Sequence, residues 1–221
     1  GVDLNRNYPY KWGYDNSGSS YNTSSTTYRG PDPASEPEVQ AMINFTNGRS
    51  FVTALTFHSS GGYYLYPYGY SAGAPIEHED VLHEYAEYMA RNNGYDFGPM
   101  ASTLYSCNGI TCDWQLHEKN IISITPEVGN THDFWPPLSQ IMPEAAENLT
   151  AQLKMFWGAG GQVKSTELAL EGGEFIPGAT QDMVLTVFNK GCGVSDEITA
   201  TLSSSDPYIT VQNGTWTVGA V

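Results

Sequence analysis

Basic residues are scarce in this 221-residue chain: nine Lys and Arg stand against 24 Asp and Glu, giving a net charge of −15. A protein this acidic is repelled by nucleic acid backbones and anionic lipid surfaces, so neither is expected as a partner. No apolar run approaches the ~20 residues that a membrane-spanning helix needs. The composition is otherwise typical of a globular protein, with 40% hydrophobic and 13% aromatic residues.

Cysteine is also rare, with three copies in the chain. Cys107 and Cys112 are five positions apart in a loop-like segment that contains Asn108-Gly109, a typical turn pair. This spacing predicts a disulfide that closes a small turn, with Cys192 left over. The pair and the acidic composition, rich in Asn, Ser and Tyr, favour a secreted protein, extracellular or periplasmic. Because Gly1 is not preceded by Met, we expect the natural protein to begin upstream.

Runs typical of strands and of helices alternate over the first part of the chain, which predicts an α/β domain over residues 1–158. Ser35, with glutamate three positions later, predicts the N-cap and capping box of the first helix. The last helix is expected to bury one apolar stripe, formed by Ala145, Leu149, Leu153 and Phe156. The expected elements are helices over 35–46, 75–92, 114–118 and 143–156 and strands over 51–57 and 121–125.

A different pattern follows the glycine-rich stretch 158–161. Short β runs are separated by Gly, Pro, Asn and Asp turns, which predicts a second, all-β domain over residues 159–221. It resembles part of an immunoglobulin-like β-sandwich, with about five strands where a complete one needs roughly seven. We therefore expect this domain to continue beyond Val221. The expected strands cover residues 167–170, 183–188, 198–202, 208–211 and 215–218.

Two polar residues stand where strands are expected to end. His58 follows a strand run and precedes Ser59-Ser60-Gly61-Gly62, and Glu127 follows the β-branched run 121–125. The ends of strands form ligand sites in α/β folds, so both residues are candidates for chemistry. In isolation, His58 could equally be a hydrogen-bonded structural histidine, and Glu127 an exposed carboxylate.

Several motifs, taken in order, resemble the later part of the zinc carboxypeptidases of the M14 (carboxypeptidase A/T) family. They are Asp3 to Tyr8, Thr56 to Gly62, Tyr66 to Gly69, Leu104 to Cys107, Asp113-Trp114 and Ser123 to Gly129. The resemblance covers residues 1–156. It implies a mixed β-sheet flanked by helices, incomplete at its N-terminal side, and zinc as the cofactor of the complete enzyme.

The resemblance also implies a role for each matching residue. His58 corresponds to a zinc ligand and Glu127 to the general base that takes a proton from the zinc-bound water. Asn5 and Arg6 correspond to the pair that binds the substrate's C-terminal carboxylate. Tyr105 corresponds to a mobile tyrosine that covers the substrate. Asp3 corresponds to an acid that orients a zinc-binding histidine.

The family's first metal motif, His-x-x-Glu, is missing from these residues. None of the other histidines has glutamate three positions later: His78, His83, His117 and His132. A catalytic zinc takes three protein ligands, and the resemblance supplies one. We therefore expect weak or absent zinc binding, an inactive chain on its own, and an open sheet edge that needs a partner. The chain is therefore expected to be aggregation-prone, dimeric, or held by a separate N-terminal portion of the same domain.

The resemblance implies a zinc metallocarboxypeptidase that acts on peptide or protein C-termini. Cys112 stands where the family selects the substrate side chain, so a preference for basic C-terminal residues is not expected. One alternative is an inactive pseudo-peptidase that keeps Asn5, Arg6 and Tyr105 as a carboxylate-binding module. Another is a cell-wall-peptide hydrolase of the same family. A His-x-x-Glu motif upstream would favour an enzyme, and assays with muropeptides would separate the two hydrolases.

Overall fold

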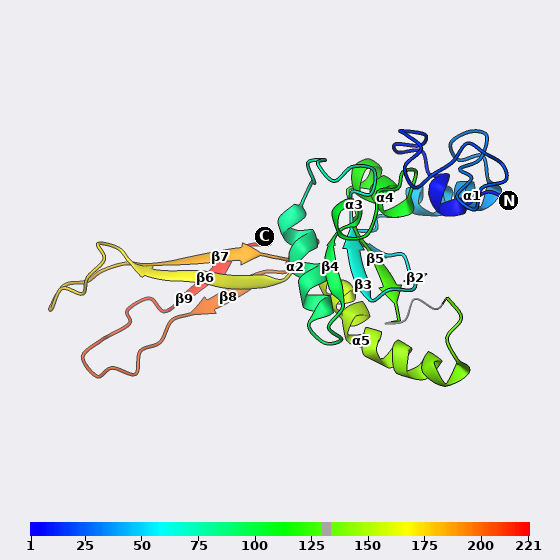
Figure 1. The fold of residues 1–221 in the computed structure, drawn as a ribbon. Coiled ribbons are helices and arrows are strands. Elements are labelled where there is room, and N and C mark those ends of the chain that lie inside the picture. Colours follow the sequence, from blue (N-terminus) through cyan, green and yellow to red (C-terminus); the bar gives the residue numbers. More distant parts are fainter. Residues whose placement is uncertain (130–133) are drawn as a thin grey trace. The chain divides into compact units, whose positions relative to one another are not determined.

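The computed structural model describes residues 1–129 and 134–221 of the chain. These residues form two compact units, Gly1–Phe156 and Trp157–Val221. Figure 1 labels the helices and strands of both units. Among the described residues, no helix is both long and apolar enough to cross a lipid bilayer.

The first unit is built on a mixed five-stranded β-sheet. Its strands are β1 (Thr53–Leu55), β2 (His58–Ser59), β3 (Tyr63–Tyr66), β4 (Asp96–Pro99) and β5 (Ile122–Val128). The order is β1-β5-β3-β4, with β2 also paired to β5. β1 and β2 run parallel to β5, whereas β3 is antiparallel to β5 and parallel to β4. β5 is therefore the central strand, and all but its last residue are buried.

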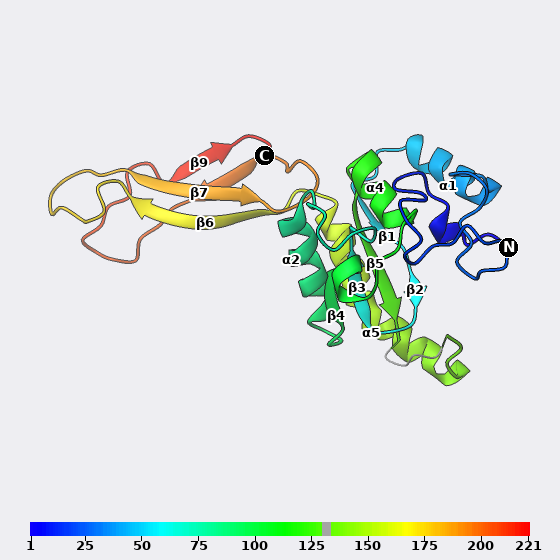
Figure 2. The same ribbon diagram turned by 45° about the horizontal axis from the view of Figure 1, so that its top comes forward.

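Helices flank this sheet (Figure 2). They are α1 (Pro37–Asn47), α2 (Glu79–Ala90), α3 (Met100–Thr103), α4 (Thr111–Lys119) and α5 (Ile141–Gly158), with 3-10 turns η1 (Leu4–Arg6) and η2 (Leu138–Gln140). α2 packs against β3 and β4, and α4 packs against β5. On α2, Leu82, Tyr85 and Met89 share one buried face because they recur at helical spacing. The mixed α/β fold expected from the sequence is confirmed.

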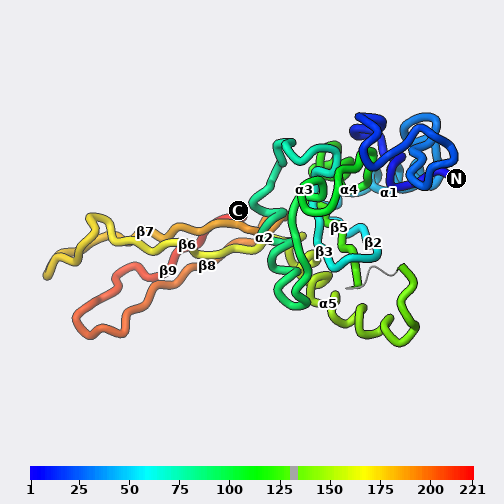
Figure 3. The backbone as a smooth tube through the Cα atoms, in the orientation of Figure 1, coloured from blue at the N-terminus to red at the C-terminus, as the bar shows by residue number. Residues whose placement is uncertain are grey.

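Between η1 and α1 the chain runs as a long loop beside α1 and α4 (Figure 3). A small core joins the three segments: Tyr8 packs with Val39 of α1 and Trp114 of α4. Asn7 is fully buried, and its Nδ2 donates to the main-chain oxygen of Arg29 at 2.8 Å. These contacts fix the loop against the helices, although it has little regular structure of its own.

The expected capping box at the start of α1 is wrong. The N-cap residue is Glu36, and no side chain makes a cap hydrogen bond. Ser35 Oγ instead accepts from Asn7 Nδ2 at 3.1 Å and donates to Glu36 Oε1 at 2.8 Å. The hydroxyl that a capping box would use is therefore occupied by the buried Asn7.

The expected inward face of α5 is also wrong. Leu149 and Leu153, predicted to be buried, are 53% and 42% exposed, whereas Asn148 and Met155 are buried. Asn148 Oδ1 accepts from the Tyr64 hydroxyl at 2.6 Å, and Asn148 Nδ2 donates to the hydroxyl of Tyr95 at 3.3 Å. These hydrogen bonds hold the Asn148 face of α5 toward the sheet, so the apolar stripe on the other face points outward.

The second unit is all β, as expected. β6 (Val163–Leu170) pairs antiparallel with β7 (Met183–Asn189), and β8 (Ile198–Thr201) pairs antiparallel with β9 (Thr215–Val218). A cavity of about 360 Å³, lined mainly by apolar side chains from all four strands, lies between the two sheets. Residues 208–211, expected as a strand, do not form one, and Tyr208 in a turn there is 95% exposed.

Candidate active site

The pairing of β2 with β5 brings His58 and Glu127 together. Their Cα atoms are partners in the parallel register, and Tyr63 of β3 is the partner of Glu127 on the other side. Glu127 thus lies inside the sheet rather than after its strand, and it is 8% exposed. Sequence analysis ended this strand at Thr125, because the neighbouring strands that extend it cannot be seen in the local pattern.

The environment of Glu127 raises the pKa of its carboxyl group into the neutral range. Burial raises the pKa of Glu127 to about 7, and the positive charge of Arg6 opposes this shift only in part. A carboxyl group with a pKa in this range can both accept and release a proton near pH 7.

The N-terminal segment meets the sheet at His58. Asn5 Nδ2 lies 3.3 Å from His58 Nε2, and Asn5 Oδ1 accepts from both the main chain and the hydroxyl of Thr111 at 2.9 Å. Because the amide oxygen faces Thr111, the NH2 group of Asn5 faces the imidazole. Burial and the charge of Arg6 lower the pKa of His58, while Asp3 raises it to a smaller extent. His58 is thereby held in its neutral form, the form that a metal ligand requires.

Asp3, which the sequence predicts to orient a zinc-binding histidine, contacts the backbone of Asn5. Its Oδ1 accepts from the main-chain nitrogen of Asn5 at 3.0 Å and caps η1. A carboxylate at the start of a helical turn satisfies an N–H group that has no partner within that turn. Asp3 thus holds the backbone of Asn5 in place.

Arg6 is buried and held on two sides. Its Nη1 donates to the main-chain oxygen of Asn5 at 2.8 Å, and its Nε donates to the main-chain oxygen of Gly18. Tyr105 lies beside Arg6 and is 48% exposed; burial raises the pKa of Tyr105, and the charge and hydrogen bond of Arg6 lower it. The structure therefore gathers His58, Glu127, Asn5, Arg6 and Tyr105 around one position.

The described residues do not fit a complete zinc site. Within residues 1–129 and 134–221, no group of three or more His, Cys, Asp or Glu side chains could hold a metal ion. In the part of the chain that the structure describes, His58 is the one imidazole at the candidate site. His132 lies outside the described residues.

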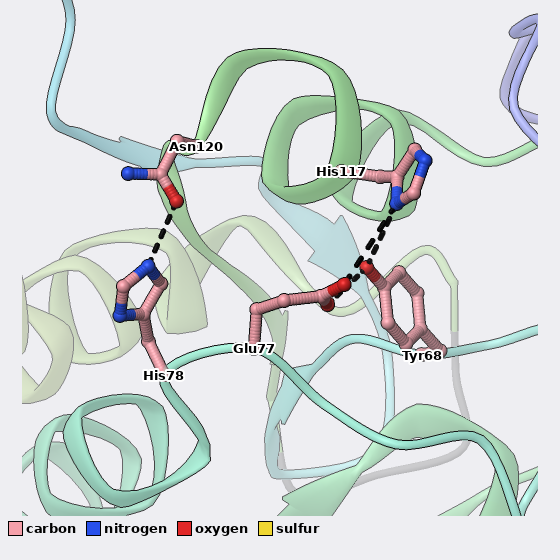
Figure 4. Close-up of polar contacts among 5 residues, drawn as sticks. All are labelled: Tyr68, Glu77, His78, His117 and Asn120. Carbon is pink, nitrogen blue, oxygen red and sulfur yellow. Dashed lines mark hydrogen bonds and ion pairs between the residues drawn. The ribbon is translucent and has the colours of Figure 1, made fainter.

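The remaining described histidines have other partners, and Figure 4 shows those of His78 and His117. His78 Nε2 lies 2.8 Å from Asn120 Oδ1. His117 stacks on Tyr10 with ring centroids 4.0 Å apart, and its Nδ1 is 3.9 Å from Glu77 Oε1. His83 Nδ1 lies 3.3 Å from the hydroxyl of Tyr66 in β3. All three are exposed, and none joins His58.

The expected disulfide between Cys107 and Cys112 is wrong, because both residues are free thiols. They share a core cluster with Ile110 and Leu65, but the two thiols point to different partners. Cys112 Sγ donates to Asp113 Oδ1 at 3.8 Å, and Cys107 Sγ lies against Gly69.

We expect Cys107 and Cys112 to resist alkylation in the folded protein and to react once it is unfolded. Both thiols are buried, and burial raises the pKa of each, so the reactive thiolate is rare. Mass spectrometry after iodoacetamide treatment, with and without urea, would measure this. Two unlabelled cysteines after unfolding without reductant would instead indicate a disulfide.

Asp113 is a buried residue that sequence analysis treated only as part of a motif. Both of its carboxylate oxygens accept from the main-chain nitrogen of Gly69, at 2.9 and 3.0 Å. Burial raises its pKa to about 7, although bonds from Gly69 and Tyr70 oppose the shift. Asp113 therefore anchors the turn after β3 to α4. Its partner is 44 positions away, so no local pattern reveals the contact.

A mixed sheet that gathers a buried carboxylate, an imidazole and a guanidinium at one position presents the groups expected of an active site in an α/β enzyme. The family model of zinc carboxypeptidases, Peptidase_M14, matches residues 1–151. The chain therefore belongs to the zinc carboxypeptidase family.

Curated relatives and solved structures agree with this assignment. The chain is 35% identical to a metallocarboxypeptidase A-like protein of Trichophyton verrucosum (strain HKI 0517), over 71% of this chain and 40% of the relative. Carboxypeptidase A5 of Macaca fascicularis is 37% identical over 68% of this chain and 36% of its own length. The crystal structure of thrombin activatable fibrinolysis inhibitor matches with a TM-score of 0.63 and 31% identity, over 70% of this chain and 41% of that one. The chain thus spans about two fifths of the length of these curated relatives.

Proposed function

We propose that these residues contribute the carboxylate-binding pair, the general base and one zinc ligand of a metallocarboxypeptidase that hydrolyses C-terminal peptide bonds. The observation that carries the proposal is the 3.3 Å contact between Asn5 and His58, where His58 is also the register partner of Glu127. This contact ties the segment proposed to bind substrate to the residues proposed for chemistry. Membership of the zinc carboxypeptidase family supports the same assignment.

In this proposal, Arg6 and Asn5 bind the C-terminal carboxylate of the substrate. A guanidinium pairs with a carboxylate through two parallel hydrogen bonds, and an amide adds a neutral donor. The two main-chain oxygens that accept from Arg6 fix the plane of its guanidinium before substrate arrives. Tyr105, half exposed beside Arg6, is proposed to cover the bound substrate.

Glu127 is proposed to move the proton. Its carboxylate takes a proton from the attacking water and passes it to the nitrogen of the departing amino acid. A pKa of about 7 suits both halves of this transfer, because neither proton uptake nor release is then strongly unfavourable.

Zinc is the cofactor of the family, and we propose His58 as its ligand in this chain. The described residues supply no complete ligand set, so the other ligands are proposed to come from a separate N-terminal portion of the same domain. We further propose a site of action outside the cytoplasm, supported by the acidic composition with its net charge of −15.

We expect the chain to prefer a peptide with a free C-terminal carboxylate over the same peptide with a C-terminal amide. One charge-assisted hydrogen bond contributes about 1.5–3 kcal/mol, so the difference in affinity should be roughly 10- to 100-fold. Isothermal calorimetry with both peptides measures it. Arg6→Ala should remove the preference, and Arg6→Lys should retain only part of it, because lysine keeps the charge but loses the planar fork.

Arg91→Ala is the matched control, because Arg91 is an exposed arginine at the C-cap of α2 and pairs with Glu87. This variant should bind both peptides as the wild type does. Equal binding of acid and amide by the wild-type chain would contradict the role given to Arg6.

A carboxylate-binding pseudo-peptidase is the second candidate, favoured by the incomplete ligand set of the described residues. It predicts the same preference for a free carboxylate. The two candidates differ in one expected result. A pseudo-peptidase, assayed as the natural protein with zinc, would bind such peptides without releasing their last residue, whereas a carboxypeptidase would release it.

A further inference from the structure

We propose that Asn108 is a positioning residue for Arg6, acting through the main-chain oxygen of Gly18. The proposal rests on the carboxylate-binding role of Arg6 given above. Asn108 follows Tyr105 by three positions and is 1% exposed. Its side chain faces the loop that carries Gly18 rather than the substrate position.

The amide of Asn108 is fully used in binding that loop. Oδ1 accepts from the hydroxyl of Ser19 at 2.6 Å. Nδ2 donates to Asp15 Oδ1 at 2.7 Å and to the main-chain oxygen of Ser17 at 3.2 Å. A single buried side chain thus holds three positions on both sides of Gly18. Because residues 15–19 belong to no helix or strand, these bonds do much to define the path of the loop.

A hydrogen bond links the restrained loop to Arg6 through Gly18. Its main-chain oxygen accepts from Arg6 Nε. The loop also has no room to move toward Tyr105, because a Cβ added at Gly18 would lie 2.1 Å from the main-chain oxygen of Ser106. The main-chain oxygen of Gly18 is therefore held on one side by close packing and on the other by Asn108.

The backbone of Arg6 is fixed by the residue next to Asn108. Gly109 has a φ of +70°, and a Cβ there would lie 2.4 Å from the main-chain oxygen of Arg6. Tyr8 N donates to the main-chain oxygen of Gly109 at 2.9 Å. Residues 108 and 109 thus restrain Arg6 at both ends, one through the guanidinium and the other through the backbone.

These hydrogen bonds fix the orientation of the Arg6 guanidinium. Nε donates to the main-chain oxygen of Gly18 and Nη1 donates to that of Asn5, so the positions of these two oxygens determine where the remaining N–H groups point. Without Asn108, the oxygen of Gly18 can shift, and the guanidinium plane turns with it. Recognition of a carboxylate by two parallel bonds depends on that plane, whereas attraction to its charge does not.

The test compares Asn108→Ala with the wild type in binding a peptide acid and its amide by calorimetry. We expect affinity for the acid to fall about tenfold, in line with the loss of one charge-assisted bond, and affinity for the amide to stay unchanged. The Arg6 Nε–H resonance, followed by NMR, should also lose its protection from solvent exchange. A purely structural role for Asn108 would not alter that resonance selectively.

Asn148→Ala is the matched control, because Asn148 is equally buried and binds Tyr64 and Tyr95 instead. It should lower stability without changing the preference for the acid. Ser19→Ala, which removes one bond to Asn108 and leaves the amide buried, should give a smaller loss in the same direction. If Asn108→Ala does not fold, the result for Ser19→Ala tests the role of Asn108 in its place.

The outcomes separate the two proposals. Wild-type protein that binds acid and amide equally overturns the role of Arg6 itself. A wild-type preference that survives in Asn108→Ala, or in Ser19→Ala where the first variant is unfolded, overturns the role of Asn108 alone. Loss of the preference in Asn148→Ala as well would show that general destabilisation is the cause, and would also overturn it.

Discussion

The 221-residue chain should release no C-terminal amino acids from peptides above the level of its own Glu127→Gln variant, even with added zinc. Among the described residues, one imidazole, that of His58, lies at the candidate site, and we propose it as a zinc ligand. If the ligands of a structural zinc bring ~10–16 kcal/mol together, each contributes on the order of 3 kcal/mol. Absence of two ligands then lowers zinc affinity by roughly four powers of ten.

A peptide-cleavage assay with detection of the released amino acid measures this, with zinc binding followed by calorimetry. Glu118→Gln is the control, because Glu118 is exposed near the end of α4. A longer polypeptide that adds a His-x-x-Glu pair to these residues is expected to be active. In that protein, Glu127→Gln should lower kcat by about 10²- to 10⁴-fold, the usual contribution of a general base. Turnover by the 221-residue chain would show that it holds ligands not recognised in the described residues.

The free energy of unfolding should fall as the pH rises from 4 to 8, and Asp113→Asn should reduce this dependence. The folded-state pKa of Asp113 is raised from 3.8 to about 7, so folding favours its protonated form. This contribution is fully present below the unfolded pKa and is lost as the pH rises through about 7. A shift of about three pKa units corresponds to about 4 kcal/mol at most.

Urea unfolding between pH 4 and pH 8, followed by circular dichroism, tests the effect. Glu127 has a pKa raised in the same direction, so part of the slope should remain in Asp113→Asn and disappear in the double variant with Glu127→Gln. Asp96→Asn is the control, because Asp96 is exposed at the start of β4. An unchanged slope in the double variant would mean that neither buried carboxyl causes the pH dependence.

Sequence patterns singled out His58 and Glu127 because each follows an apolar β run. The structure places both within paired strands, as register partners in β2 and β5, rather than after the strands. The mixed α/β fold was predicted from the alternation of strand and helix runs, and the family from the order of the motifs; both are confirmed. The roles of Asn5, Arg6 and Tyr105 remain predictions, although the structure places all three beside these residues.

The patterns failed where a polar contact from a distant part of the chain decides the structure. α5 has apolar residues on two faces, and Asn148 selects the buried one through hydroxyl groups contributed by β3 and the segment before β4. Asn108 and Ser19 are 89 positions apart, so nothing near either residue predicts their hydrogen bond. The disulfide was predicted from spacing alone, which carries no information about the directions of the two thiols.

The candidate site combines two parts that should differ in their resistance to local unfolding: the paired strands and the irregular loop that carries Gly18. His58 and Glu127 belong to paired strands, whereas the oxygen that orients Arg6 lies in a loop without regular structure, held by the side-chain bonds of Asn108. Segments of this kind open in sub-global fluctuations that cost far less than complete unfolding, while central strands stay closed. Mild denaturant or warming should therefore impair recognition of the substrate terminus first, leaving the base and its neighbouring imidazole in register. The affinity of such a protein would then decline over a range of conditions in which its sheet still exchanges amide hydrogens slowly.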